Sequence, residues 1–246
     1  MEIIPIHLTG DVNANSNIAN LILASIKNEG QQLSNNDVLV VAHKIISKSE
    51  GKMIDLTSVR PSKRAINIAK KHGKDSRITE TILRESKRIV KMKRGIIITE
   101  TKHGFVCANA GVDKSNVHGD FVALLPENPD RSAERIRQTI RRQTGKNVAV
   151  IISDTFGRPF REGQVNVAIG VSGMKPIKDY RGSNDMFGNK LRVSEIAVAD
   201  EIASAAELVM GKTNHVPIAI IRGLAYENKK GSAKELIRDR NYDLFR

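Results

Sequence analysis

The sequence contains very little of the residue chemistry on which several protein classes depend. Among its 246 residues there are one cysteine and no tryptophan, and aromatic residues make up only 4%. A single cysteine cannot form an internal disulfide, which excludes a small secreted domain held together by disulfides. Cys107 lies within an apolar run, so we interpret it as a small buried hydrophobic residue rather than a nucleophile.

Long apolar segments are also absent. No run reaches the roughly 18 consecutive apolar residues of a transmembrane helix. The first residues, Met1 to His7, lack the basic region and long apolar core of a signal peptide. We therefore expect a cytoplasmic protein without a membrane partner.

Several catalytic signatures do not occur. The sequence has no P-loop, no glycine-rich dinucleotide motif after a strand and no nucleophile elbow. One cysteine and six scattered histidines give no zinc-ligand spacing. A nucleotide or metal site must therefore be built from other residues.

The chain is strongly basic, with a net charge of +13 that favours anionic partners. Between Ser62 and Gly95 there are twelve basic and three acidic residues. We expect two helices here, separated at Gly73, with Ile78, Ile82 and Ile89 on the apolar side of the second. This region has no aromatic residue for stacking on bases, so we favour a solvated face or a surface that attracts an anionic substrate over a nucleic-acid site.

Apolar patterns predict alternating strands and helices. Strands are expected at 2–8, 38–42, 96–99, 105–108, 122–125, 148–152 and 216–221, and amphipathic helices at 18–26, 131–142 and 199–209. The polar segment 178–189 is a long loop of the functional or mobile kind. Without repeats or linkers, residues 1–246 are expected to form one unit, or two interleaved subdomains.

The segment that begins at Val148 carries the most informative polar residues. Its apolar run to Ile152 is typical of a strand buried on both faces, and we expect it to stop just before Asp154 and Thr155. Such oxygen ligands suit hard cations. Arg158 and Arg161 follow, and guanidinium groups suit phosphate or carboxylate. A plain Asx turn with two solvated arginines is an equal alternative on these residues alone.

Two further strand ends carry polar groups. The strand at 38–42 is followed by His43, Lys44 and Lys48, which together suit an anion, although lysines in such places are more often only solvated. The loop after 105–108 contains Asp113 and Asn116. Carboxylates beside cations indicate divalent-metal-assisted work on a phosphate-bearing substrate, and the residues alone go no further.

Several motifs together resemble the coenzyme F-420-0:gamma-glutamyl ligase family. They occur in the family's order between residues 5 and 223, at 40–51, 109–117, 124–130, 152–161, 198–203, 210–211 and 221–223. The resemblance implies an α+β fold of mixed sheets with flanking helices, in an intertwined homodimer with its site near the subunit interface.

The activity implied by this resemblance is GTP-dependent amide-bond formation. Such a ligase adds L-glutamate to the lactyl carboxylate of coenzyme F-420-0 through an acyl phosphate, and then adds a gamma-linked glutamate. Two divalent ions, Mg or Mn, and potassium are implied as well.

The resemblance also assigns roles to residues, although none as the catalytic base. It makes Asp113 and Asp154 metal ligands and puts Thr155 at a second metal ion. It implies GTP contacts from Thr9, Gly10, Asp11, Val12, His43, Lys44, Lys48, Asn116, Met210, Gly211 and Lys212. Arg158 and Arg161 remain candidates for holding the phosphate of the coenzyme.

One position departs from the family pattern. Lys212 stands where a family member can place an acidic ligand for the second metal ion, and an ammonium group cannot coordinate Mg. Asn214, His215 or a backbone carbonyl would have to replace that ligand. Two alternative functions stay open: a related nucleotide-dependent amino-acid ligase acting on another phosphorylated carboxylate, and, disfavoured by the missing aromatics, a basic nucleic-acid-binding protein.

Overall fold

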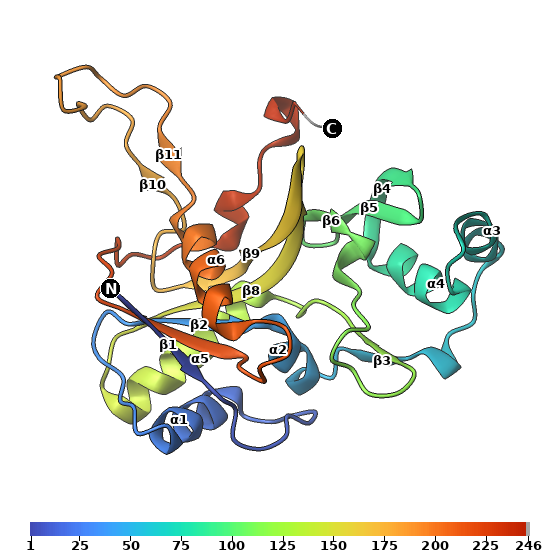
Figure 1. The fold of residues 1–246 in the computed structure, drawn as a ribbon, viewed down its shortest axis with the longest axis horizontal. Helices are drawn as coiled ribbons and strands as arrows, with labels where there is room; N and C mark the ends of the chain where they lie inside the picture. The colour runs from blue at the N-terminus through green and yellow to red at the C-terminus, as the bar shows by residue number, and fades with distance from the viewer. Residues whose placement is uncertain (245–246) are drawn as a thin grey trace.

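The computed structural model describes residues 1–244, and its largest element is a five-stranded sheet (Figure 1). The strands lie in the order β1-β12-β2-β8-β9. Their bounds are β1 Glu2–Ile6, β12 Ile218–Arg222, β2 Val38–Ala42, β8 Ala149–Arg158 and β9 Arg161–Ser172. The pairing is antiparallel except between β2 and β8, which are parallel.

The parallel pair forms the centre of the sheet. In its register Val41 lies opposite Ile152 and Ala42 opposite Ser153. Val38 to Val41 are completely buried, as are Ala149 to Ile152, because both faces of the sheet are covered. Because β8 continues past the end of β2, the polar residues that follow β2 lie beside the polar residues in the second half of β8.

Helices cover both faces of this sheet. On one face lie α1 Ile18–Asn28 and α5 Pro129–Thr144, and α6 Val198–Met210 lies on the other (Figure 1). Asn17 caps α1 by accepting a hydrogen bond from the Asn20 N–H. The short helix α2 His43–Ser49 begins directly after β2, and Ile45, Ile46 and Ser47 bury it against the core.

A second group of elements has its own apolar core, which includes Leu56, Ile82, Ile97 and Val122. It lies beside the main sheet (Figure 1). The elements are β3 Met53–Asp55, α3 Lys63–His72, α4 Ser76–Glu85, β4 Ser86–Lys93, β5 Ile96–Thr101, β6 Val106–Ala108 and β7 Phe121–Ala123. Strands β4-β5-β6 form one sheet and β3-β7 another.

A hairpin arm projects from the molecule between α6 and the end of β9 (Figure 1). The short strands β10 Lys178–Asp179 and β11 Glu195–Ile196 pair at its base. Met186 and Phe187 are 89% and 81% exposed. In the part of the chain that the structure describes, no helix is long and apolar enough to cross a membrane.

The predicted mixture of helices and several sheets is confirmed, and four local expectations are wrong. Residues 86–93 form strand β4 and not a continued helix, because their apolar side chains pack on β5. Strand β8 continues to Arg158 and pairs with β9, so Asp154 and Thr155 lie within a strand and not after it. Helix α2 and the paired base of the arm were not expected.

The last part of the described chain packs against the main core. Ala233 is 1% exposed in the main core, at the start of a short 3-10 helix, Ala233–Leu236. Asp130 on α5 accepts hydrogen bonds from the Ser232 hydroxyl at 2.5 Å and the Ala233 N–H at 2.9 Å. The tail therefore closes over the main core.

Gly170 on β9 provides a test of how closely α5 packs on the sheet. A Cβ atom at this position would lie 2.6 Å from the backbone carbonyl of Pro129. We expect Gly170→Ala to lower the free energy of unfolding by about 1–3 kcal/mol, because the rigid backbone must move. Gly157→Ala is the matched control, since no atom lies within 4 Å of its added Cβ. Equal stabilities in chemical denaturation would contradict this packing.

Candidate active site

A cleft of about 640 Å³ opens at the carboxyl end of β2, beside Ser153 and Asp154 in β8. Its walls come from the loop after β1, from α2, from the segment before β7 that contains Asn116 to His118, and from the end of α6. Eleven of the residues expected at the site line it: Gly10, Asp11, Val12, His43, Lys44, Lys48, Asn116, Asp154, Met210, Gly211 and Lys212. Segments far apart in the sequence therefore meet in one cavity.

His43 and Asp154 form the floor of this cleft. His43 is 2% exposed, and its Nε2 lies 3.3 Å from Asp154 Oδ1. The two atoms do not meet the angles of a hydrogen bond, which leaves Nε2 buried without a hydrogen-bond partner. The Ser47 hydroxyl donates to the Leu124 carbonyl at 2.6 Å, so its oxygen is free to accept from His43 Nδ1 at 3.4 Å. With the proton on Nδ1, a nitrogen lone pair faces the carboxylate.

Lys44 connects the cleft to Asp113. Its Nζ lies 2.7 Å from Asp113 Oδ2 and donates to the Ser115 hydroxyl at 2.6 Å. The Ser115 N–H and hydroxyl also donate to the carboxylate, at 2.7 and 2.8 Å. Burial alone would raise the pKa of Asp113, but the Lys44 ammonium and the Ser115 hydrogen bonds outweigh it and hold that pKa below its usual value. Asp113 is therefore an anion paired with a cation.

Lys212 lies at the end of the cleft that follows α6. Its ammonium group donates to Thr155 Oγ1 and lies 3.5 Å from Glu207 Oε1. Thr155 in turn donates to the Asn166 side-chain carbonyl at 2.6 Å, and the Asn166 amide donates to Glu207 at 2.8 Å. A fixed positive charge thus lies among oxygen atoms of the kind that bind hard cations.

The remaining expected residues lie near the cleft or away from it. The Thr9 backbone and hydroxyl contact the Ser25 hydroxyl on α1, and Thr9 does not line the cavity. Asn116 donates to the Lys212 carbonyl at 3.1 Å and so joins two walls. Arg158 and Arg161 lie at the β8–β9 turn, where Arg158 donates to the Glu162 carbonyl, and neither lines the cleft.

Sequence reasoning missed several residues of the cleft, above all Asn166 and Glu207. Asn166 is 4% exposed and lies opposite Thr155 in the β8–β9 ladder. A polar residue between two valines within a long apolar strand was the available signal. Glu207 lies on the polar side of α6, where a carboxylate is ordinary, so no comparable signal existed.

Cys107 is buried, as the sequence predicts. Burial, with a further contribution from the charge of Asp154, raises the pKa of its thiol to about 12. The thiolate is the nucleophilic form, so Cys107 is inert at neutral pH although it lies near the site.

The floor of the cleft fits a divalent ion. Asp154 offers a carboxylate, and the buried, unpartnered His43 Nε2 and Ser153 hydroxyl offer lone pairs beside it. Within residues 1–244, no group of three or more histidine, cysteine, aspartate or glutamate side chains could enclose a metal by itself. A divalent ion beside Asp154 would therefore need further oxygen ligands, such as the phosphates of a substrate.

These features define a mixed α and β protein with a cleft that combines carboxylates, ammonium groups and amide oxygens. The family model for F420-0:Gamma-glutamyl ligase matches residues 8–223, and the chain belongs to this family. The resemblance inferred from the sequence motifs is confirmed.

Relatives cover nearly the whole chain, and each is named coenzyme F420:L-glutamate ligase. The protein of Methanothermobacter thermautotrophicus is 47% identical over 96% of this chain and 94% of its own length. That of Methanocaldococcus jannaschii is 50% identical over 87% of this chain and 86% of its own. That of Methanopyrus kandleri is 44% identical over 100% of this chain and 98% of its own.

Lys44→Gln tests the electrostatic account of Asp113. Removing the ammonium leaves burial opposed only by Ser115, so we expect the pKa of Asp113 to rise, measured by carboxyl ¹³C NMR titration. In the wild type, the lowered pKa contributes stability above the unfolded-state pKa that is lost as the pH falls through the folded-state pKa. The variant should lose this contribution at neutral pH.

Lys114→Gln is the control for this titration. Lys114 is adjacent in the chain but pairs with Asp120 at 3.2 Å. An unchanged Asp113 titration in Lys44→Gln, or an equal shift in Lys114→Gln, would contradict the assignment.

Proposed function

We propose that this protein is a GTP-dependent ligase that attaches L-glutamate to coenzyme F-420-0. The observation that carries the proposal is the convergence of the motif residues of 40–51, 109–117 and 152–161 with Met210 and Gly211 around one cleft. The names of the relatives give the substrates, glutamate and the coenzyme, and the three lysines of the cleft support binding of a nucleotide.

The proposed reaction has two steps. The acceptor carboxylate attacks the γ-phosphorus of GTP, so that an acyl phosphate forms and GDP leaves. The glutamate amine then attacks the acyl carbon, the amide bond forms, and inorganic phosphate leaves with the bonding electron pair while the amine loses a proton. Repetition on the glutamate side-chain carboxyl gives the gamma linkage.

The residues of the cleft suit the charges of these steps. Lys44, Lys48 and Lys212 place ammonium groups where an anionic nucleotide meets an anionic acceptor, which reduces their repulsion. Asp154 would hold a divalent ion, Mg or Mn, which neutralises phosphate charge, and Asp113 would become a ligand by exchanging its ion pair with Lys44 for the metal. The Lys212 ammonium donates to Thr155, and its positive charge replaces part of the charge that a second metal ion would supply. Potassium dependence remains a prediction from the family resemblance.

Asp154→Asn tests the site and the activity together. We expect the ligation rate to fall by about a hundredfold or more, because the variant cannot carry the charge that holds the ion. The assay combines protein, coenzyme F-420-0, L-glutamate, GTP and Mn or Mg. Mass spectrometry then follows the mass gain of glutamate residues, and nucleotide turnover is measured in parallel.

Asp120→Asn is the matched control, since Asp120 is a partly buried aspartate paired with Arg77 and Lys114 outside the cleft. Full activity of Asp154→Asn would refute the metal assignment. If the wild type added no glutamate to this acceptor, a panel of other phosphorylated carboxylates would test the related ligase as the alternative.

We further propose that the protein is a homodimer in which the arm between β10 and β11 contacts the partner subunit. The arm extends away from its own core (Figure 1). Its exposed Met186, Phe187 and Val193, the last 86% exposed, supply an apolar surface that a monomer would leave in water.

Replacing the arm's apolar residues tests this assembly. We expect the double substitution Met186→Ser and Phe187→Ser to raise the dimer dissociation constant by about tenfold or more, measured by light scattering after size exclusion over a concentration series. Leu208→Ser, at an 82% exposed position on α6, is the control. A monomeric wild type, or an unaffected double variant, would refute the role of the arm.

A further inference from the structure

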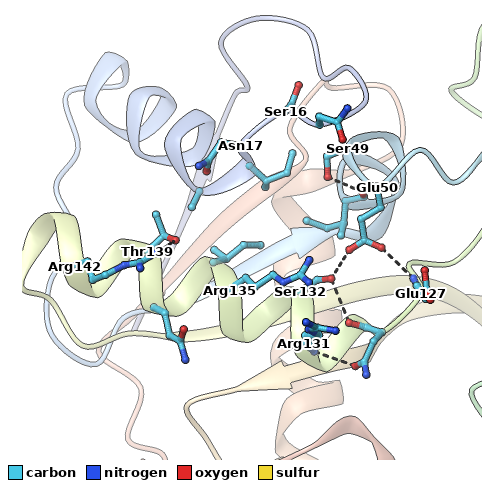
Figure 2. A pocket seen from close by; sticks show the side chains of 17 residues that line it. Ser16, Asn17, Ser49, Glu50, Glu127, Arg131, Ser132, Arg135, Thr139 and Arg142 are labelled. Atoms are coloured by element: carbon cyan, nitrogen blue, oxygen red, sulfur yellow. Dashed lines mark hydrogen bonds between the residues drawn. The ribbon is translucent and has the colours of Figure 1, made fainter.

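A second cleft, of about 880 Å³, lies between α1 and α5 (Figure 2). We call it the arginine cleft, because Arg131, Arg135 and Arg142 line it from one side of α5. Their spacing of four and seven residues places all three on one face of the helix. The Thr139 side chain lies between the last two (Figure 2). Nothing in the proposed ligase reaction uses this cavity.

The carboxylates of the arginine cleft are already engaged with other groups. Glu50 accepts hydrogen bonds from the Ser132 hydroxyl and from the Glu127 N–H, the latter at 3.1 Å. The Glu127 carboxylate lies 3.0 Å from Lys52. Among residues 1–244, none of the three arginines forms an ion pair. Figure 2 shows the two glutamates at one end and Arg142 at the other. The charge of Glu127 acts on Arg131, so the excess positive charge of the cleft comes from Arg135 and Arg142.

The opposite wall of the arginine cleft contributes N–H groups that also suit an anion. Ser16, Asn17, Ile18 and Ala19 line the cleft at the start of α1, whose first turn contains no acidic residue. The first N–H groups of a helix have no partner within the helix and carry partial positive charge. Three guanidinium groups and a helix start therefore face one cavity.

The length of the arginine cleft defines the kind of ligand. Arg131 and Arg142 are eleven residues apart on α5, which corresponds to roughly 16 Å along the helix. A single phosphate could contact only one or two of these groups. We propose that the arginine cleft is a second ligand site that binds an extended small polyanion, a chain bearing several phosphate or carboxylate groups.

Two segments connect the arginine cleft with the candidate active site. In the loop after β1, Gly10 to Val12 line the active-site cleft and Asn15 lines the arginine cleft. In α2, Lys44 lines the first and Ser49 the second. The Asn15 N–H donates to the Ser49 carbonyl at 2.8 Å and ties the two segments together. Ligands in the two clefts are therefore expected to change each other's affinity.

Calorimetric titration tests the site with two probes that separate the sources of the shared chemistry, inorganic tripolyphosphate and tri-γ-glutamate. For the double variant Arg135→Gln and Arg142→Gln, we expect the affinity for the bound probe to fall about tenfold or more, because charge-assisted hydrogen bonds are lost. Arg141→Gln with Lys146→Gln removes the same charge outside the cleft and should change the affinity about twofold or less. Lys44→Gln with Lys48→Gln should retain probe binding, which separates the two clefts.

Equal losses in the two double variants would overturn the site, because they would show attraction by overall charge. Absence of binding of both probes to the wild type would overturn it as well. Thermal melting checks that each variant is folded; Arg135, Arg141, Arg142 and Lys146 are exposed, and Lys44 and Lys48 are partly exposed.

A repeat titration with GTP and Mg present tests the coupling, and this part alone rests on the proposed function. We expect the probe's affinity to change several-fold and the affinity for GTP to change by the same factor. Equal affinities with and without GTP would overturn the coupling. If GTP itself did not bind, the proposed function would fail, while the polyanion titrations without GTP would still decide the site.

Discussion

The parallel pairing of β2 with β8 is the constraint on which the candidate site depends. Ala42 lies opposite Ser153, so His43, the first residue after β2, lies beside Asp154, where β8 continues past the end of β2. Both strands are buried on both faces, and a shift of register would bury polar groups and disrupt the core. The apolar packing of β2 and β8 therefore fixes the positions of the polar side chains in the site.

The polar contacts of the cleft serve chiefly to position charge. Lys44 is held by Asp113 and Ser115, and Lys212 by Thr155 and Glu207. Such partly exposed ion pairs contribute little to stability, about 0–1 kcal/mol each. An arriving anion can therefore share or replace these contacts at low cost, while the ammonium groups are already in place. Preorganised charge of this kind is what stabilises phosphate groups during a reaction.

The sequence allowed the centre of the fold and most of the cleft to be predicted, for reasons specific to each element. Continuous apolar runs indicated β2 and β8 because both are buried on two faces. The run at 148–152 did not show that β8 continues to Arg158, because the partner strand β9 supplies the pairing. Helix α2 is seven residues long and capped by no side chain, so it has no local start signal. Lys212 contacts Thr155 only through tertiary packing.

Helix α2 also explains why binding in the arginine cleft is expected to affect binding in the candidate active site, because α2 lines both clefts. Ile45, Ile46 and Ser47 fix α2 against the core, and Ser47 is bonded to the Leu124 carbonyl. A buried helix of two turns cannot bend within itself, so a displacement at Ser49 reaches Lys44. Packed elements of this kind adopt discrete positions. A ligand in the arginine cleft that favours one position of α2 therefore favours the same position of α2 in the candidate active site.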